Sequence, residues 1–330
     1  MDDAHGGPHA FTYAHAHFQW VLTLLNSPHT DTTHRKLLVA LGELGHLTGW
    51  LARDVLNGNL ATQYWHTAYK AACSAGDTAL SAHVLQTMAT HADHDGRPRE
   101  ARELYEAVLS ASTRLPAGVI ALTQCHATLA HAHLADLPAC ERAYGEAMEA
   151  LSRIGDPQDQ PSFLYWLNER SIQQVPGEAF LVAGQPARAE TLLRQAIAPE
   201  DGYQRDDIIH ETYLGLALLD QNELEAACGA ARRAIGLVDQ VSSPRAADHL
   251  RLLCDRMQPH ADQIDIRETL DDAGAAINQK GPPDSVRASD GSRHWPQGPR
   301  IAVDLAATRC LGQQGAGHPP AEGLPCAPHC

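Results

Sequence analysis

The feature that most constrains the fold of this chain is a spacing of small and bulky residues that recurs five times along it. Each set starts with a small residue, usually has a bulky residue four positions later, and ends on a small or apolar residue at the seventh position. Positions i, i+4 and i+7 share one face of an α-helix, so each set predicts a helix that packs through this face. The sets are Ala61/Trp65/Ala68, Ala101/Tyr105/Val108, Cys140/Tyr144/Ala147, Ala189/Leu193/Ala196 and Ala227/Ala231/Ala234.

Another small residue stands twelve positions before the start of every set. Two helices can cross closely only where the side chains at the crossing point are small. This residue therefore predicts another helix that precedes the helix of the set and packs against it. We therefore expect five helical hairpins, each with a first arm and a second arm. The small residues of the first arms are Gly49, Ala89, Thr128, Gly177 and Gly215.

A small residue in the first arm and a small–bulky–small set in the second arm resemble the tetratricopeptide repeat, whose helix pairs recur about every 34 residues. The sets of this chain start 38 to 49 residues apart, so its helices or loops are longer than usual for that repeat. The resemblance implies an all-α, right-handed α-solenoid of about five helical hairpins.

Breaks in the helical periodicity predict the limits of this organisation. Gly and Pro become frequent after about Ile277, a composition typical of disorder. Pro176 falls in the expected first arm of the fourth hairpin, where its ring should kink the helix. The expected parts are a leader with one helix (1–32), the five hairpins (33–242), a pair of C-terminal capping helices (243–278) and a disordered tail (279–330).

In a solenoid of such hairpins, the first arms line the concave surface, and the register of the sets shows which of their residues face it. The first two hairpins place mainly polar side chains and histidines there, beside a tryptophan and an arginine. Trp and Arg are frequent in binding sites. The predicted ligand- or peptide-binding groove comprises Glu43, His46, Trp50, Arg53, His83, Gln86, His94, His133, Gln174 and Glu178.

Composition narrows the class of partner. A net charge of −15 and a pI near 5.7, without a clustered basic face, argue against direct binding of nucleic acid. No uncharged apolar run is long enough to span a membrane, and the N-terminus has acidic residues where a signal peptide has basic ones. The eight cysteines include no CxxC pair, which indicates free thiols in a reducing compartment. We expect a cytoplasmic protein that binds neither nucleic acid nor membrane.

Motifs for catalysis and cofactor binding are missing from the sequence. It has no GxSxG elbow, no P-loop and no GxGxxG after a strand. The histidines around His91 and His126 form neither an HExxH motif nor the spacing of a Cys/His finger. We therefore expect no enzyme activity, no cofactor and no metal site. A metal-dependent enzyme that uses the clustered histidines stays open as an alternative.

Beyond the repeat itself, several segments resemble the C-terminal tetratricopeptide region of actinobacterial helix-turn-helix transcriptional regulators. The longest is ELGHLTGWLARDVLNGNLATQYWHTAYKAACSAGDTAL (43–80), and the likeness covers about residues 30 to 265. It implies a regulatory protein whose repeats sense a partner or dimerise. Other segments that carry the likeness are HADHDGRPREARELYEAV (91–108), LADLPACERAYGEAMEAL (134–151), FLYWLNERS (163–171) and GQPARAETLLRQAI (184–197).

The residues before the first hairpin are too few for the DNA-binding domain of those regulators. The chain is thus expected either to be truncated there or to regulate without touching DNA. The leading hypothesis is a non-enzymatic regulatory module that binds a protein or peptide partner, or a small-molecule signal. The alternative is a structural scaffold that forms a homodimer through its repeats and leaves the groove unoccupied.

Overall fold

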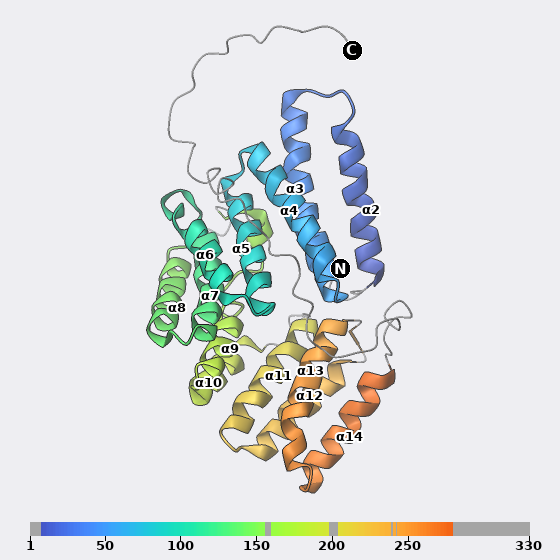
Figure 1. Ribbon diagram of the computed structural model, residues 1–330, viewed down its shortest axis with the longest axis vertical. Helices are drawn as coiled ribbons and strands as arrows, with labels where there is room; N and C mark the ends of the chain where they lie inside the picture. The colour runs from blue at the N-terminus through green and yellow to red at the C-terminus, as the bar shows by residue number, and fades with distance from the viewer. Residues whose placement is uncertain (1–7, 156–159, 198–203, 239, 242, 280–330) are drawn as a thin grey trace.

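The computed structural model of the chain describes residues 8–155, 160–197, 204–238, 240–241 and 243–279. Of these residues 82% are helical and none lies in a strand, which confirms the predicted all-α class. The helices pack in adjacent pairs, an arrangement consistent with an α-solenoid (Figure 1). The tail predicted to be disordered, 279–330, lies outside the described residues except for its first position.

Five helix pairs follow one another along the chain, and a turn of three residues joins the two helices of each pair. Helix α2 (Pro8–Leu25) precedes them and packs on α3, whereas α13 (Pro244–Met257) and α14 (Ile264–Gln279) follow them. The pairs are α3 (Asp31–Asp54) with α4 (Gly58–Ala75), α5 (Thr78–His94) with α6 (Pro98–Leu109), α7 (Ala117–His133) with α8 (Leu137–Ser152), α9 (Gln174–Val182) with α10 (Pro186–Ala196), and α11 (Gln204–Asp220) with α12 (Leu224–Val238).

The turns within the five pairs share one backbone geometry. In each turn the middle residue has a positive φ, and it stands five positions before the start of a repeat set. Glycine takes this left-handed conformation without strain, whereas a residue with a Cβ loses about 1–2 kcal/mol. The same local structure therefore recurs at one register position of the sequence. The five residues are Leu56, Gly96, Ala135, Gly184 and Asn222.

The residues of the repeat sets form the contacts between the helices of each pair. All of them are buried except Tyr144, which is half-buried. A Cβ added to Gly49 would lie 2.2 Å from the indole nitrogen of Trp65, and one added to Gly177 would lie 2.7 Å from Leu193. These are the crossings of small and bulky residues that the sequence predicts.

The fifth pair departs from this rule. Its second arm has alanine, Ala231, at the bulky position. A Cβ added to Gly215 of its first arm would meet Leu253 of α13, 2.7 Å away. A side chain from the next helix thus occupies the space that a bulky residue fills in the first and fourth pairs, and α13 packs directly on α11.

The kink predicted at Pro176 is wrong. Helix α9 begins at Gln174, so Pro176 lies in its first turn, where the backbone N–H groups have no partner within the helix. The segment before it, from Tyr165 to Gln173, forms turns instead of a longer helix. The proline therefore stands at the start of a short first arm.

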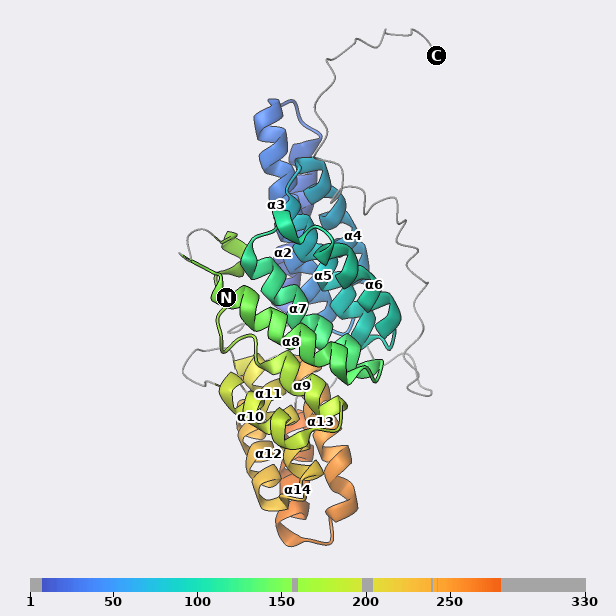
Figure 2. The same cartoon turned by 90° about the vertical axis from the view of Figure 1, so that its left-hand side faces the viewer.

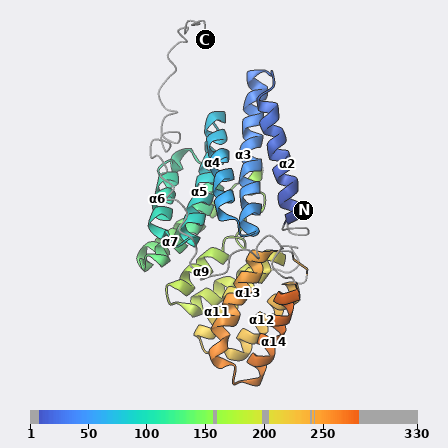
Figure 3. The same cartoon turned by 45° about the vertical axis from the view of Figure 1, so that its right-hand side comes forward.

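The first arm of the first pair, α3, meets α13, which follows the fifth pair. Figures 1 and 2 show α2–α8 as one group of helices above α9–α14, and Figure 3 shows the end of α3 over the start of α13. The Ser243 hydroxyl, which also caps α13, donates to Asp54 Oδ1 at 2.8 Å. The Arg245 guanidinium lies 3.3 Å from the same oxygen. A buried polar contact thus joins helices nearly 200 positions apart.

Candidate functional site

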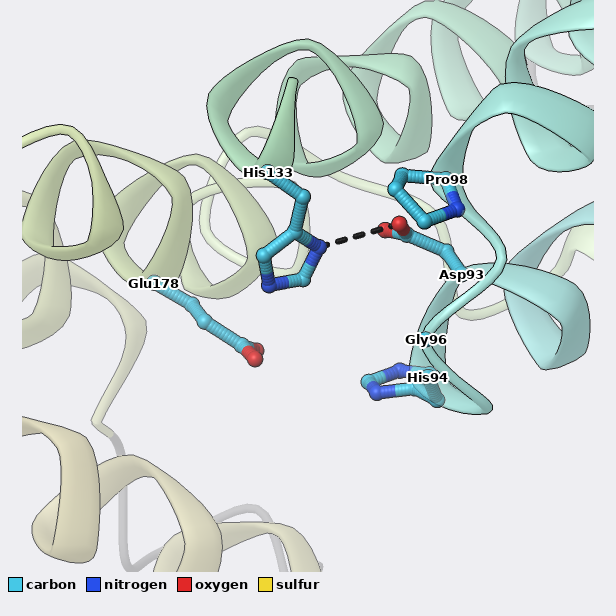
Figure 4. A pocket seen from close by; sticks show the side chains of 6 residues that line it. All are labelled: Asp93, His94, Gly96, Pro98, His133 and Glu178. Atoms are coloured by element: carbon cyan, nitrogen blue, oxygen red, sulfur yellow. Dashed lines mark hydrogen bonds and ion pairs between the residues drawn. The ribbon is translucent and has the colours of Figure 1, made fainter. Parts of the chain in front are cut away.

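A cavity of about 400 Å³ lies where the first arms α5, α7 and α9 meet (Figure 4). Pockets that take small ligands commonly measure about 300–1,000 Å³. The side chains drawn in Figure 4 come from three successive helix pairs and surround one space. The lining residues are Asp93, His94, Gly96, Pro98, His133 and Glu178.

The ends of two first arms bring these side chains together. Asp93 and His94 belong to the last turn of α5, and the left-handed Gly96 turns the chain so that α6 can begin at Pro98. His133 is the last residue of α7. Because α5 and α7 lie side by side with the same direction, their C-terminal turns reach the same wall of the cavity. Glu178 faces them from α9.

His133 and Asp93 form a hydrogen-bonded pair between the second and third helix pairs. The Nδ1–H of His133 donates to Asp93 Oδ1 at 2.9 Å. The Asp93 side chain is 1% exposed and the His133 side chain 32% exposed, so the imidazole lies between the buried carboxylate and the cavity. The bond to Asp93 raises the pKa of His133 above its usual value. The other ring nitrogen of His133 lies on the side of Glu178 (Figure 4).

The carboxyl group of Glu178 is buried on the opposite wall. Tyr213 of α11 donates its hydroxyl to Oε1 at 2.6 Å, and Gln174 donates its amide to Oε2 at 3.3 Å. Burial raises the pKa of Glu178 to about 7, although these bonds and the charge of His133 oppose the shift. The protonated form of this carboxyl is therefore favoured more than that of an exposed glutamate.

Two arginines, Arg53 and Arg245, lie near this wall. His94 is exposed and lines the cavity, and desolvation, with the charge of Arg53, lowers its pKa well below the usual value. Desolvation also lowers the pKa of Arg53 to about 10, helped by the charge of Arg245 and opposed by Asp95 and Glu178. The guanidinium of Arg53 is hydrogen-bonded to His91.

Every one of the first arms, together with α13, contributes to this network of interacting polar groups. The contributions span the chain from α3 to α13, although among the described residues three of these first arms, α5, α7 and α9, line the cavity directly. They are Arg53 from α3, Asp93 and His94 from α5, His133 from α7, Gln174 and Glu178 from α9, Tyr213 from α11 and Arg245 from α13.

Five of the ten residues predicted for the groove belong to this network: Arg53, His94, His133, Gln174 and Glu178. The structure does not bring the other five to the cavity. Glu43 is exposed on α3, and the remaining four lie in a separate cluster between α3 and α5. The ten predicted residues thus divide into five in the network, four between α3 and α5, and Glu43 apart from both.

The separate cluster consists of His46, Trp50, His83 and Gln86. The Trp50 indole donates to His46 Nε2 at 3.2 Å, and the rings of His46 and His83 lie 4.4 Å apart. His83 also stacks on Phe163, at 4.7 Å. The Gln86 amide donates to a threonine hydroxyl of its own helix at 3.0 Å. Burial lowers the pKa of His46 to about 4 and that of His83 well below its usual value. These histidines are neutral packing residues.

Three residues of the network were not among those predicted for the groove. Asp93 precedes His94 in the inward-facing turn, so its register position could have identified it. Tyr213 stands one position away from an inward position of α11. Arg245 lies in the segment that was expected only to cap the stack, and no sequence signal places that segment against α3.

Among the described residues, none of the helices combines the length and the apolar character that a membrane crossing requires. Within this same part of the chain, no three His, Cys, Asp or Glu side chains are grouped as metal ligands would be. Comparison with known proteins yields no match, either to a protein family or to a curated protein sequence.

Proposed function

We propose that this chain is a non-enzymatic binding module that captures a small molecule or a short peptide segment in the cavity between α5, α7 and α9. One observation carries the proposal. Titratable side chains from three successive first arms, Asp93, His94, His133 and Glu178, converge on this one space. Burying such groups costs free energy, and a packed apolar core would avoid that cost.

The regulatory part of the proposal rests on the resemblance to the repeat region of actinobacterial helix-turn-helix regulators. Tetratricopeptide-like arrays present their first arms to a partner, and the cavity is built from first arms. A ligand held between α7 and α9 would contact both groups of helices, above and below in Figure 1, and would thereby bias their relative position. This gives a sensing role a physical basis.

The composition of the lining favours binding over catalysis. The part of the cavity wall formed by described residues contains no serine, threonine or cysteine, and so it offers no such side-chain nucleophile. A second function proposed from the sequence, a dimerising scaffold with nothing in the cavity, makes a different prediction for the purified protein.

The test uses the full chain, produced without an affinity tag in an actinobacterial host. Native mass spectrometry would give the mass of the intact protein, and analysis of the denatured sample would identify any species released. We expect about one bound species per chain. Glu178→Gln, which keeps the size of the side chain but changes its charge, should lose it. Glu43→Gln makes the same chemical change on an exposed part of α3 and should retain it.

Two results would contradict the proposal. The first is a bound species that Glu178→Gln retains as well as the wild type does. The second is a protein with no bound species at all, and if that protein were a dimer it would support the scaffold function.

A further inference from the structure

One side of α2 exposes large aromatic side chains to solvent. Tyr13 and Trp20 are 67% and 60% exposed, and His17 stands between them on the helix, with its ring 4.2 Å from the Tyr13 ring. Together with Leu24 these residues occupy positions i, i+4, i+7 and i+11, so they follow one line along the helix. We call Tyr13, His17, Trp20 and Leu24 the α2 stripe.

The buried side of α2 is a different line of residues. Ala14, Phe18 and Val21 are buried, and each stands one position after a member of the α2 stripe, about 100° further around the helix. This side packs on α3, and the Phe18 ring meets Tyr64 of α4 with ring centroids 5.0 Å apart. Figures 1 and 3 show α2 at the edge of the upper group of helices, with α3 and α4 on one side of it.

The two ends of the stack differ in charge. The C-terminal end is α14, which exposes Asp265, Arg267, Glu268, Asp271 and Asp272. Arrays of helical repeats need a polar outer face of this kind on their terminal helices in order to remain in solution. Helix α2 has no Asp, Glu, Lys or Arg among its 18 residues. At the N-terminal end the stack therefore presents a surface that is typical of an interaction site.

We propose that the α2 stripe is the interface of a homodimer, in which two copies of α2 pack antiparallel about a twofold axis. In this arrangement Tyr13 lies opposite the partner's Leu24, and His17 lies opposite the partner's Trp20. Each contact then occurs twice, as a twofold axis requires. The antiparallel direction also sets the two helix dipoles against each other, which is favourable.

The charge of the chain favours a second copy as the occupant. With a net charge of −15, two copies repel each other over most of their surfaces, but α2 brings no like charges into the contact. A charged partner would find no opposite charge on α2. A membrane surface also fits less well, because helices that lie in a membrane surface are rich in Lys and Arg on their polar face.

The exposed area fits a weak dimer. A Tyr or Trp side chain covers about 150–250 Å² when it is buried, so the exposed parts of Tyr13 and Trp20 amount to about 200–300 Å² on each copy. Specific interfaces bury at least about 1,000 Å² in total, and the aromatic surfaces of two copies supply about half of this. His17, Leu24 and the flanking residues, on a helix about 27 Å long, can supply the rest. The dimer should therefore dissociate in the micromolar range of concentration.

This interface is independent of the proposed binding function. Of the described residues that line the cavity, none belongs to α2. It also differs from a dimer formed through the repeats, because α2 precedes the first helix pair. A ligand in the cavity and a second copy on α2 can therefore be present together.

Sedimentation velocity of the full chain, measured from submicromolar to high micromolar concentration, tests the proposal. We expect the sedimentation coefficient to rise with concentration from that of a monomer to that of a dimer. Trp20→Glu and Tyr13→Glu each place a carboxylate where the dimer would bury it, so each should weaken dimerisation about tenfold or more. Both residues are exposed in the single chain, so both variants should fold, and circular dichroism checks this.

Tyr165→Glu is the matched control. Tyr165 is 81% exposed in the segment before α9, so this variant makes the same chemical change away from α2 and should dimerise like the wild type.

Two results would overturn the proposal. The first is a chain that stays monomeric at every concentration. In that case, flotation with phosphatidylcholine vesicles that Trp20→Glu abolishes would identify a membrane as the occupant. The second is a dimer that both α2 variants leave as stable as the wild type, which would place the interface elsewhere on the chain. Neither result depends on whether a species is bound in the cavity, so this failure and that of the proposed binding function can be told apart.

Discussion

Replacing Gly49 by alanine tests the packing rule on which the fold depends. The new Cβ would lie 2.2 Å from Nε1 and 2.5 Å from Cδ1 of Trp65, far closer than atoms can approach. The Trp65 side chain is fully buried, and its indole donates to the backbone oxygen of His46 at 3.1 Å. The ring cannot move aside without breaking this bond and disturbing the contact between α3 and α4.

The expected loss of stability follows from three contributions. Overpacking a core costs about 1–3 kcal/mol. Leaving the indole N–H of Trp65 buried without its acceptor costs about 1–3 kcal/mol more. Alanine favours the helix over glycine, which stabilises the folded protein by about 1 kcal/mol. The free energy of unfolding should therefore fall by about 1–5 kcal/mol.

Equilibrium unfolding in urea measures this change, and Gly145→Ala is the matched control. Gly145 lies inside α8, and no atom lies within 4 Å of a Cβ added there, so this variant should gain about 0.5–1 kcal/mol. The double variant Gly49→Ala/Trp65→Tyr reproduces the combination of Ala89 and Tyr105 in the second pair and should recover part of the loss. A Gly49→Ala protein as stable as the wild type would refute the reasoning.

Three other predictions concern the turns, the buried histidines and the contact between α3 and α13. Ala135 has a φ of +56° on an exposed turn, so Ala135→Gly should raise the free energy of unfolding by about 0.5–1 kcal/mol; a loss measured in urea would contradict the left-handed geometry. Burial lowers the pKa of both His46 and His126 to about 4, so the unfolded chain, with values near 6.5, binds more protons between these limits. The free energy of unfolding should therefore be unaffected by these two histidines above pH 6.5 and should fall between pH 6.5 and pH 4, by up to about 3 kcal/mol for each histidine. Equal urea midpoints at pH 7 and pH 5 would contradict this prediction. Asp54→Ala removes the acceptor of Ser243 and Arg245 and should cost about 1–3 kcal/mol in the same assay, so an unchanged midpoint would show that this contact contributes nothing.

Much of the fold could be predicted because it depends on local spacing. The position of each turn follows from the repeat register, and the left-handed residue in each of the five turns within the pairs stands at the same distance before its set. Gly96 and Gly184 indicate such a turn in the sequence, because glycine favours a positive φ. Leu56 and Ala135 give no such indication. Their backbone strain is tolerated because the packing of two helices fixes the turn.

The site could be predicted only in part. The register predicts that His94, His133 and Glu178 face one side, because each position is set within its own helix, and all three line the cavity. It could not show that α3 and α5 bring the rings of His46 and His83 to 4.4 Å from each other, away from the cavity. It also could not show that α13 returns to α3 and brings Arg245 to Asp54, because that contact depends on how the turn angles add up over the whole chain.

The most direct test of the central claim, that successive first arms form one electrostatic site, is an NMR titration of the His133 ring in the full chain. We expect the pKa of His133 to lie above its usual value, because Asp93 of α5 holds its Nδ1–H and Glu178 of α9 adds negative charge. The pKa should fall clearly in Asp93→Asn and by a smaller amount in Glu178→Gln, while Glu43→Gln leaves it unchanged. An ordinary pKa for His133 that none of these variants alters would show that α5, α7 and α9 do not meet as described.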